Sequence, residues 1–268
     1  YSDTSLMAYV VHVVSFKVNA APGGSVSDNS GMDPVLVKYC LVIAATYKLH
    51  PDFLATVADL LVQTDTQLST PVAVVFIAER GSVEFNEDVI LQIQAALQTR
   101  MRHVLALTGI ERDTAVADAV LRLLARVQFH SYNSYFALLA SAAVILDTFP
   151  YGGCLTTHDA LSHGVPIVSY PQRYVRGRFT LAMYQQMNVS EYTVDSPAEY
   201  VNVVLHVLRR TEEEITLART RILGAFHIQT GGEKPPGSSG HGYLHQNTRV
   251  AKEWLGFLVK AWRYQYEV

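Results

Sequence analysis

The stretch 144–171 constrains the fold of this 268-residue chain more than any other segment. It joins two apolar runs, at 142–146 and 166–170, through a loop with two adjacent glycines and a polar segment that opens on two threonines. This pattern predicts a buried strand, a turn, a helix and a second buried strand. Strands joined by helices form parallel sheets, whose ligands bind beyond the carboxyl ends of the strands. We therefore predict an α/β fold, a doubly wound parallel sheet with its site in this stretch.

Other apolar runs extend this alternation along the chain. The run at 35–45 is apolar almost throughout, which suits a central strand that is covered on both faces. We predict strands at 6–18, 35–45, 71–78 and 127–130, and helices at 53–62, 88–99, 113–126, 135–142, 197–210 and 212–226.

The start of the helix that follows the two glycines suits an anion. The first backbone N–H groups of a helix have no partner within the helix, and the helix dipole adds partial positive charge there. Glycines let a ligand approach the main chain closely. We therefore predict a phosphate-binding site at Gly152, Gly153, Thr156 and Thr157, and we predict that Asp159 accepts a hydrogen bond from a sugar hydroxyl.

Each of these residues also has a purely structural explanation. Thr156 can cap the helix, Gly152 and Gly153 can form an ordinary turn, and Asp159 can be a first-turn carboxylate that the helix dipole favours. Taken singly, the structural explanation is the simpler one for each residue. Taken together, the residues describe a pocket for a diphosphate and a ribose.

The same stretch resembles a known motif. The run D-T-F-P-Y-G-G-x-x-T-T-x-D-A-L-x-x-G-V-P-I-V is similar to the donor-binding motif of glycosyltransferase family 41, which contains the protein O-GlcNAc transferases and the SPINDLY-type protein O-fucosyltransferases. The F-P-Y wording at 149–151 is closer to the SPINDLY and bacterial branches. The resemblance covers roughly 35–268 and implies the Rossmann-like C-terminal lobe of the two-lobed GT-B fold.

A second segment carries the resemblance. After the predicted strand at 35–45 comes T-Y-K-L-H-P-D, and then the helix predicted at 53–62. Family members have a strand, a loop with Tyr-Lys-Ile/Leu-x-Pro and a helix here, and their lysine contacts the donor diphosphate. The resemblance implies that Lys48 is the catalytic residue that neutralises charge on the departing diphosphate. Without the resemblance, a solvated loop lysine is the simpler interpretation.

Several positions depart from the family pattern. By alignment from the motif, the family's histidine falls at Tyr135, a lysine at Tyr132 and the base-contacting arginine of animal O-GlcNAc transferases at Leu138, while a family glutamine falls at Ala45. Tyrosine stacks on bases and also donates a hydrogen bond, so we keep Tyr135 as a predicted donor-nucleotide residue. These departures leave the identity of the nucleotide undecided, so the predicted donor is either UDP-GlcNAc or GDP-fucose.

A basic cluster follows the second strand of the motif. It contains Arg173, Arg176 and Arg178. The family places a Ser-Arg pair at the start of the next helix, which here reads Gly-Arg, so the resemblance implies that Arg178 contacts the donor. The three arginines can equally pair with nearby carboxylates such as Glu191 or Asp195.

Composition limits the classes of partner. Net charge is −3 and the pI is about 6.4, without a dense basic block, so we predict neither nucleic acid nor an anionic membrane as a partner. No apolar run reaches about 18 residues and no basic region is followed by an apolar core and a cleavage site, so we predict no membrane segment in this sequence and expect any targeting signal to lie upstream of Tyr1. Cys40 and Cys154 cannot form a disulfide framework, which favours the cytoplasm or the nucleus.

The domain prediction is a single nucleotide-sugar-binding lobe over 1–268. Runs rich in glycine, serine and proline predict flexible loops at about 22–33 and 229–246. The chain begins with Tyr rather than Met, which indicates a piece of a longer protein. We find neither a repeat of about 34 residues nor a second Rossmann unit, so we expect a missing N-terminal lobe or repeats to bind the acceptor protein.

A helix is predicted at the end of the chain, at about 248–264. Its apolar positions repeat at helical spacing, which indicates a packed face rather than a cofactor site. The resemblance implies that a terminal helix of this kind packs back across to the first lobe of the GT-B fold. The face consists of Val250, Trp254, Phe257, Leu258 and Trp262.

These arguments predict the donor-binding lobe of an inverting, metal-independent protein O-glycosyltransferase, which moves GlcNAc or fucose from a nucleotide diphosphate to Ser/Thr. No metal and no cofactor besides the donor are implied, because Lys48 and the helix dipole take the role of a divalent ion. One alternative is a degenerate lobe that acts as a non-catalytic scaffold, which Ala45, Tyr135 and Leu138 favour. Another is a sugar-nucleotide epimerase of similar two-lobed fold, which the F-P-Y-G-G wording fits poorly.

Overall fold

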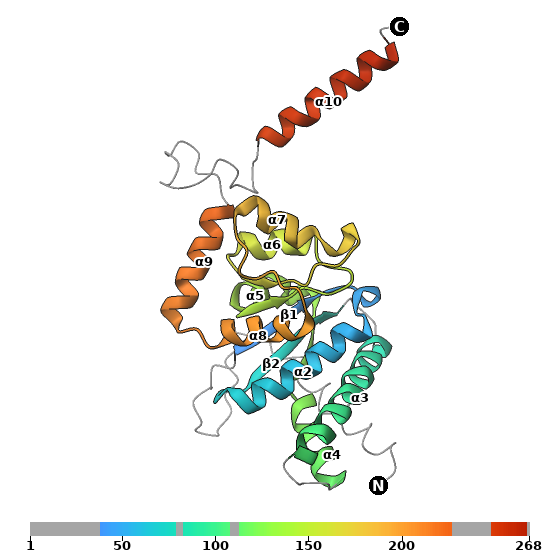
Figure 1. Ribbon diagram of the computed structural model, residues 1–268, viewed down its shortest axis with the longest axis vertical. Coiled ribbons are helices and arrows are strands. Elements are labelled where there is room, and N and C mark those ends of the chain that lie inside the picture. The colour runs from blue at the N-terminus through green and yellow to red at the C-terminus, as the bar shows by residue number, and fades with distance from the viewer. Residues whose placement is uncertain (1–37, 79–82, 108–112, 227–247, 267–268) are drawn as a thin grey trace.

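The computed structural model describes residues 38–78, 83–107, 113–226 and 248–266, and these form one five-stranded sheet with helices around it (Figure 1). All strand pairs are parallel, and the strand order is β3-β2-β1-β4-β5. The strands are β1 (Lys38–Ile43), β2 (Val72–Ala78), β3 (Val127–Ser131), β4 (Val144–Leu146) and β5 (Ile167–Val168). The predicted doubly wound parallel sheet is therefore confirmed. The strand predicted at 6–18 and the loops predicted at 22–33 and 229–246 lie outside the described residues.

The helices occur in the predicted order, and several are longer than predicted. The helix predicted at 88–99 extends in both directions, and the helix predicted at 53–62 begins at Pro51, whose fixed φ suits the first helical position. The helices are α2 (Pro51–Gln67), α3 (Val83–Leu107), α4 (Asp113–Leu124), α5 (Tyr135–Ser141), α6 (Leu155–Ser162), α7 (Phe179–Met187), α8 (Pro197–Leu208), α9 (Glu212–Phe226) and α10 (Thr248–Tyr266), with short turns η1 (Thr46–Lys48), η2 (Tyr132–Ser134) and η3 (Val175–Gly177).

The order of the strands decides which loops meet. β1 lies in the middle of the sheet and pairs with β2 on one side and β4 on the other, so that Cys40 is in register with both Val74 and Val144. The carboxyl ends of β1 and β4 are therefore neighbours. The segments that follow them, η1 and the glycine loop, lie beside each other although about a hundred residues separate them in the chain.

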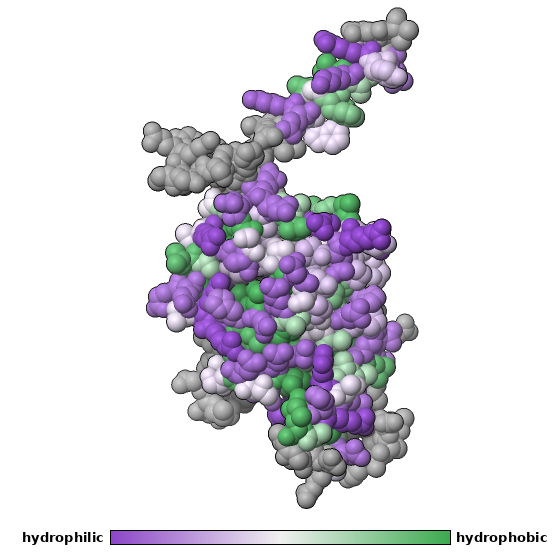
Figure 2. Space-filling model, in the orientation of Figure 1, coloured by the Kyte–Doolittle hydropathy of each residue, from purple (hydrophilic) through white to green (hydrophobic). Residues whose placement is uncertain are grey.

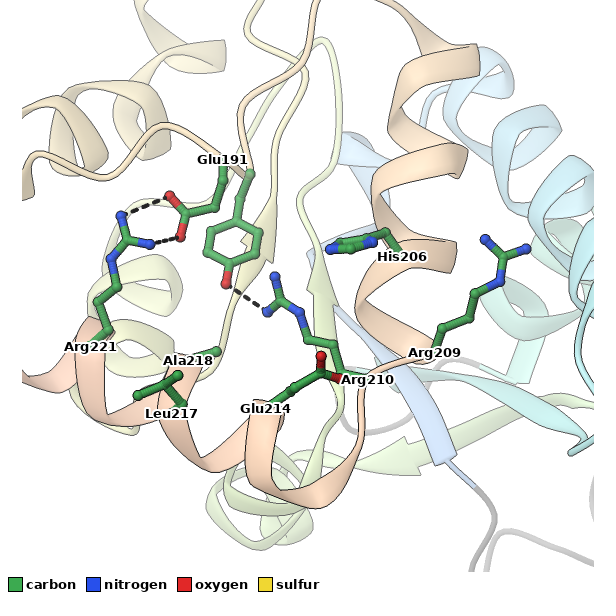
Figure 3. A pocket seen from close by; sticks show the side chains of 9 residues that line it. Glu191, His206, Arg209, Arg210, Glu214, Leu217, Ala218 and Arg221 are labelled. Carbon is green, nitrogen blue, oxygen red and sulfur yellow. Dashed lines mark hydrogen bonds and ion pairs between the residues drawn. The ribbon is translucent and has the colours of Figure 1, made fainter.

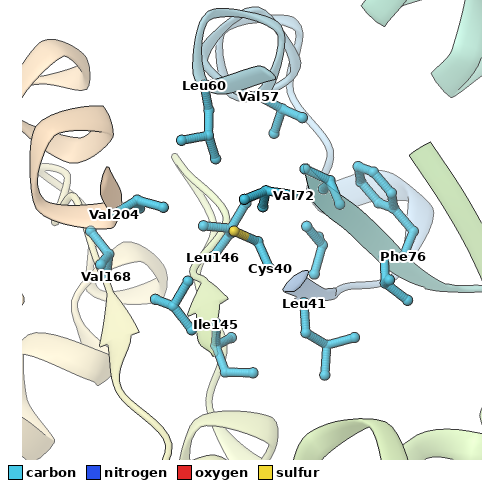
Figure 4. Packing of buried hydrophobic residues seen from close by; sticks show 14 of the residues in the cluster. Cys40, Leu41, Val57, Leu60, Val72, Phe76, Ile145, Leu146, Val168 and Val204 are labelled. Atoms are coloured by element: carbon cyan, nitrogen blue, oxygen red, sulfur yellow. The ribbon is translucent and has the colours of Figure 1, made fainter. Parts of the chain in front are cut away.

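The core lies on both faces of the sheet. Successive strand residues point to opposite faces, so that Cys40 and Leu146 face α2 and α8 while Leu41 and Ile145 face the other side (Figure 4). Val204 of α8 completes the layer next to α2 (Figure 4). Because both faces are covered, the central part of β1 is apolar, as the run at 35–45 predicts.

The apolar face of α10 is exposed, so the described part of the chain supplies no core for it. Trp254 is 61% and Trp262 59% exposed, and Phe257 and Leu258 are exposed as well. Figure 1 shows α10 projecting away from the sheet, and Figure 2 shows hydrophobic side chains along it next to hydrophilic ones. The spacing of apolar residues indicates that a face packs against something, without saying that the partner lies in this part of the chain. Among the described helices, none has the length and apolar character needed to span a membrane.

Candidate functional site

The loop between β4 and α6 is held by the buried carboxylate of Asp147, which the sequence analysis missed. One carboxylate oxygen accepts a hydrogen bond from the N–H of Gly153 at 2.7 Å, and the other accepts one from the hydroxyl of Ser169 at 2.7 Å. The N–H of Gly152 donates to the carbonyl of Arg176 at 3.0 Å. The signal in the sequence was an aspartate directly after a buried strand. Asp147 therefore fixes Gly153, and the carbonyl of Arg176 fixes Gly152.

Burial controls the protonation of Asp147. Removal from water raises the pKa of this carboxyl, while the hydrogen bonds from Ser169 and Gly153 and the positive charge of Lys48 act in the opposite direction. Burial likewise lowers the pKa of Lys48, and the charge of Asp147 opposes that shift. The two groups therefore support each other's charged forms at this end of the sheet.

Gly153 has no room for a side chain. A Cβ atom built there would lie 2.5 Å from the hydroxyl oxygen of Thr157 and 2.9 Å from that of Thr156. At Gly152, a Cβ atom would lie 3.0 Å from a carboxylate oxygen of Asp147. The glycines are therefore needed because hydroxyl and carboxylate groups crowd the loop, which an ordinary turn would not require.

The amino end of α6 faces this loop. The helix begins at Leu155, and the side chain of its N-cap, Cys154, makes no capping hydrogen bond within the part of the chain that the structure describes. The interpretation of Thr156 as a simple cap is wrong, because Thr156 lies inside the first turn. The interpretation of Asp159 as a first-turn carboxylate is wrong as well, since the first turn contains no acidic residue. Such an end offers its backbone N–H groups to an anion.

The two threonines differ in their surroundings. Thr157 is buried, and its hydroxyl lies 3.2 Å from the hydroxyl of Thr180 in α7. Thr156 is half-buried at the helix start, next to Gly153. Thr156 is thus the more accessible hydroxyl, while Thr157 connects α6 to α7.

Lys48 reaches the glycine loop. It ends η1, directly after β1, and its ammonium donates to the carbonyl oxygen of Gly152 at 3.0 Å. The same nitrogen lies 4.5 Å from the centre of the Tyr151 ring. The structure therefore brings Lys48, Gly152, Gly153 and the start of α6 together.

Of the three arginines, Arg176 shares an aromatic neighbour with Lys48. Its guanidinium carbon lies 6.0 Å from the centre of the Tyr151 ring, which Lys48 also contacts. Arg178, which the sequence analysis favoured, is exposed at the start of α7 and donates to the carbonyl of Gln172 at 3.2 Å. The alternative that these arginines pair with Glu191 is wrong, because Glu191 pairs with Arg221 of α9 at 2.9 Å.

Tyr135 and Asp159 are joined. The phenol of Tyr135 donates to a carboxylate oxygen of Asp159 at 2.9 Å. Burial raises the pKa of Tyr135 most, and this hydrogen bond raises it further. The phenol therefore stays protonated and remains the donor. Its ring is only 1% exposed and lies parallel to the ring of Tyr132, with 5.0 Å between the centroids. Tyr132 is 54% exposed, so the accessible aromatic surface belongs to Tyr132 rather than to Tyr135.

The other departures from the family pattern carry no polar side chain to the site. Leu138 is buried, and Ala45 is half-buried just before η1. Among the residues that the structure describes, no three histidine, cysteine, aspartate or glutamate side chains are grouped to hold a metal ion.

Comparison with known proteins supports the fold. No family model matches the chain. No curated protein matches it by sequence. Among solved structures, a mutant O-GlcNAc transferase from Thermobaculum terrenum matches with a TM-score of 0.51 at 20% identity, over 69% of this chain and 31% of that one. The chain thus spans about a third of the length of that structure.

Two further matches are weaker. A UDP-forming α,α-trehalose-phosphate synthase from Burkholderia xenovorans has a TM-score of 0.44 at 13% identity, over 82% of this chain and 46% of that one. The N-terminal domain of trehalose-6-phosphate phosphatase from Candida albicans has a TM-score of 0.44 at 11% identity, over 84% and 42%. Scores this low carry no argument. The match to the O-GlcNAc transferase concerns the fold alone, and it agrees with the predicted Rossmann-like α/β fold.

Proposed function

We propose that this chain is the donor-binding lobe of a protein O-glycosyltransferase, which transfers GlcNAc or fucose from a nucleotide diphosphate sugar to Ser/Thr. The observation that carries the proposal is the 3.0 Å contact between the ammonium of Lys48 and the carbonyl of Gly152. It places a positive charge on a glycine loop that runs into an uncapped helix start. The fold shared with an O-GlcNAc transferase supports the same conclusion.

The diphosphate is the part of the donor that this geometry suits best. An ammonium has three N–H donors, and the bond to Gly152 uses one of them, so two remain for phosphate oxygens. The backbone N–H groups at the start of α6 and the hydroxyl of Thr156 supply further donors. As the bond from the sugar to the diphosphate breaks, negative charge grows on the diphosphate, and Lys48 and the helix dipole stabilise it. In this proposal Lys48 is the catalytic residue and no metal ion is required.

The nucleoside is assigned to Asp159 and the neighbouring tyrosines. The hydrogen bond from Tyr135 holds the Asp159 carboxylate in one orientation, ready to accept from a ribose hydroxyl. The exposed ring of Tyr132 offers a flat surface on which a base can stack. Both features serve uracil and guanine alike, so the donor is UDP-GlcNAc or GDP-fucose.

The acceptor is assigned to another part of the protein. A lobe that holds only the donor cannot place a hydroxyl for in-line attack, and such attack from the side opposite the diphosphate would invert the sugar carbon. We therefore propose that a further lobe or helical repeats bind the acceptor protein. Free Cys40 and Cys154 suit a reducing compartment, so we place the protein in the cytoplasm or the nucleus.

One observation favours a second candidate, a non-catalytic scaffold. Leu138, at the position of the base-contacting arginine in animal O-GlcNAc transferases, is buried and apolar. A lobe that had lost its nucleotide would no longer need a polar group there.

Calorimetric titration distinguishes the two candidates. The purified chain is titrated with UDP, GDP, UDP-GlcNAc and GDP-fucose. One nucleotide is expected to bind, and Lys48→Ala and Asp159→Ala are each expected to weaken it about tenfold or more, because a hydrogen bond to a charged group contributes roughly 1.5–3 kcal/mol. Lys260→Ala, which removes an exposed lysine of α10, is the matched control. A folded chain that binds none of the four ligands would favour the scaffold.

A further inference from the structure

A cavity of about 460 Å³ lies between α8, α9 and the loop residues Glu191 and Tyr192 (Figure 3). It is separate from the proposed donor site, which lies at the carboxyl ends of β1 and β4. The ammonium of Lys38, the first residue of β1, donates to the carbonyl oxygens of Leu208 at 3.2 Å and Arg210 at 3.0 Å. The cavity therefore lies near the amino end of β1, whereas the proposed donor site lies at the carboxyl ends of the strands.

The walls of this cavity carry an excess of positive charge. Arg209, Arg210 and Arg221 line it, against two carboxylates, Glu191 and Glu214. Figure 3 shows Arg210 in the middle, with Arg221 on one side and Arg209 on the other. In formal charge, the three guanidinium groups exceed the two carboxylates by one.

Both carboxylates are already engaged. Glu191 forms an ion pair with Arg221, with 2.9 Å between the nearest nitrogen and oxygen. Glu214 caps its own helix, because its carboxylate accepts from the N–H of Thr211 at 2.8 Å and its own N–H donates to the Thr211 hydroxyl at 3.3 Å. Arg221 thus neutralises Glu191, while the Glu214 carboxylate keeps its charge and is directed to the amino end of α9.

Arg209 and Arg210 have neutral partners instead. Arg209 donates to the side-chain oxygen of Gln67. Arg210 donates to the hydroxyl of Tyr192 at 2.9 Å, and its guanidinium carbon lies 5.5 Å from the centre of that ring. Within the described residues, neither arginine has a carboxylate in ion-pair distance. Two guanidinium charges therefore remain available to a ligand.

Arg210 is also held in position before any ligand arrives. Tyr192 is 1% exposed, so the ring and hydroxyl that contact the guanidinium belong to the core. A donor that is fixed in advance loses little conformational entropy when it binds, and the planar guanidinium fork matches the oxygens of a phosphate.

We propose that this cavity binds a small phosphomonoester, with Arg210 and Arg209 on the phosphate. A phosphomonoester carries nearly two negative charges at neutral pH, which matches two guanidinium groups without carboxylate partners. The volume lies within the range of small-molecule sites and exceeds the size of phosphate alone. The carbon part of the ligand lies against the apolar wall of Leu217 and Ala218. The proposal stands independently of the proposed donor site.

The test is calorimetric titration of the whole chain at low salt with glucose 6-phosphate, inorganic phosphate and malonate. Glucose 6-phosphate is expected to bind more tightly than inorganic phosphate, which lacks the carbon part, and malonate is expected to bind weakly. Arg210→Gln is expected to weaken glucose 6-phosphate about tenfold or more, and Arg209→Gln severalfold. Arg100→Gln removes an exposed arginine of α3, which pairs with Asp59, and is expected to change nothing.

Two further variants keep the test decisive. Arg210→Lys keeps the charge and is expected to bind more tightly than Arg210→Gln, which guards against a loss caused by misfolding. Lys48→Ala is expected to keep full affinity for glucose 6-phosphate. Arg210→Gln is expected to bind UDP or GDP with the same affinity as the wild type. The proposal is overturned if the folded wild type binds no phosphomonoester, or if Lys48→Ala abolishes binding and Arg210→Gln does not, since the phosphate would then occupy the donor loop.

Discussion

The buried carboxylate of Asp147 accepts a 2.7 Å hydrogen bond from the backbone N–H of Gly153. It thereby fixes the glycine loop to the end of β4, while its other oxygen accepts from Ser169 of the segment after β5. The same carboxylate supports the positive charge of Lys48. Asp147 thus holds the proposed phosphate site together without facing the ligand.

Replacement of Asp147 by Asn is expected to lower both stability and nucleotide affinity. An amide has one oxygen and an NH₂ group that cannot accept, so one buried donor, of Gly153 or Ser169, loses its partner. An unsatisfied buried donor costs about 1–3 kcal/mol. Urea denaturation measures the change. Ser169→Ala removes a donor instead and is expected to cost less, so equal losses in the two variants would contradict this account.

Gly153→Ala is expected to distort the start of α6. The new methyl group would lie 2.5 Å from the Thr157 hydroxyl, and relief of such overpacking typically costs about 1–3 kcal/mol. Gly224→Ala is the matched control, because a Cβ atom at Gly224, in the last turn of α9, meets nothing within 4 Å. That control is expected to stabilise the protein by up to about 1 kcal/mol. Thermal unfolding of both variants checks the contrast, and a neutral Gly153→Ala would mean that the loop adapts freely.

Tyr135→Phe tests whether Asp159 contacts a ribose. The change removes the hydrogen bond to Asp159 and leaves the ring to stack on Tyr132. We expect the affinity for the nucleoside diphosphate to fall about twofold to tenfold, as for the loss of one ordinary hydrogen bond that orients a ligand group. Calorimetry with the ribonucleotide and its 2′- and 3′-deoxy analogues provides the check. If the substitution weakens all of them equally, Asp159 does not bind a ribose hydroxyl.

His130 is expected to make stability depend on pH in the acidic range. It is buried in β3, and burial lowers its pKa below the ordinary value of 6.5. The unfolded chain therefore binds a proton more readily than the folded chain, so the contribution of His130 is complete above pH 6.5 and is lost as the pH falls toward the folded-state pKa. Urea denaturation of the wild type and His130→Gln across this range measures it. The difference between the two should shrink with decreasing pH, and a constant difference would contradict the assignment.

Much of the site was predictable from local patterns. The adjacent glycines, the two threonines and Asp159 lie within eight positions of one another, and their spacing alone indicates a loop that opens a helix. The alternation of apolar runs with helical spacing indicated the parallel sheet, because each period reflects the geometry of its own element. These are short-range properties of the chain.

The remaining features depend on contacts between distant segments. Whether Lys48 is a solvated lysine or part of the loop was decided by the pairing of β1 with β4, which brings it onto a carbonyl 104 residues away. The buried role of Asp147, the covering of Tyr135 by Tyr132 and the exposure of the α10 face were settled in the same way. The sequence by itself determined which elements form and that a glycine loop opens a helix after β4, since both follow from local backbone geometry. Only the tertiary structure decided which side chains meet there, because strand order and packing bring together residues that no local spacing connects.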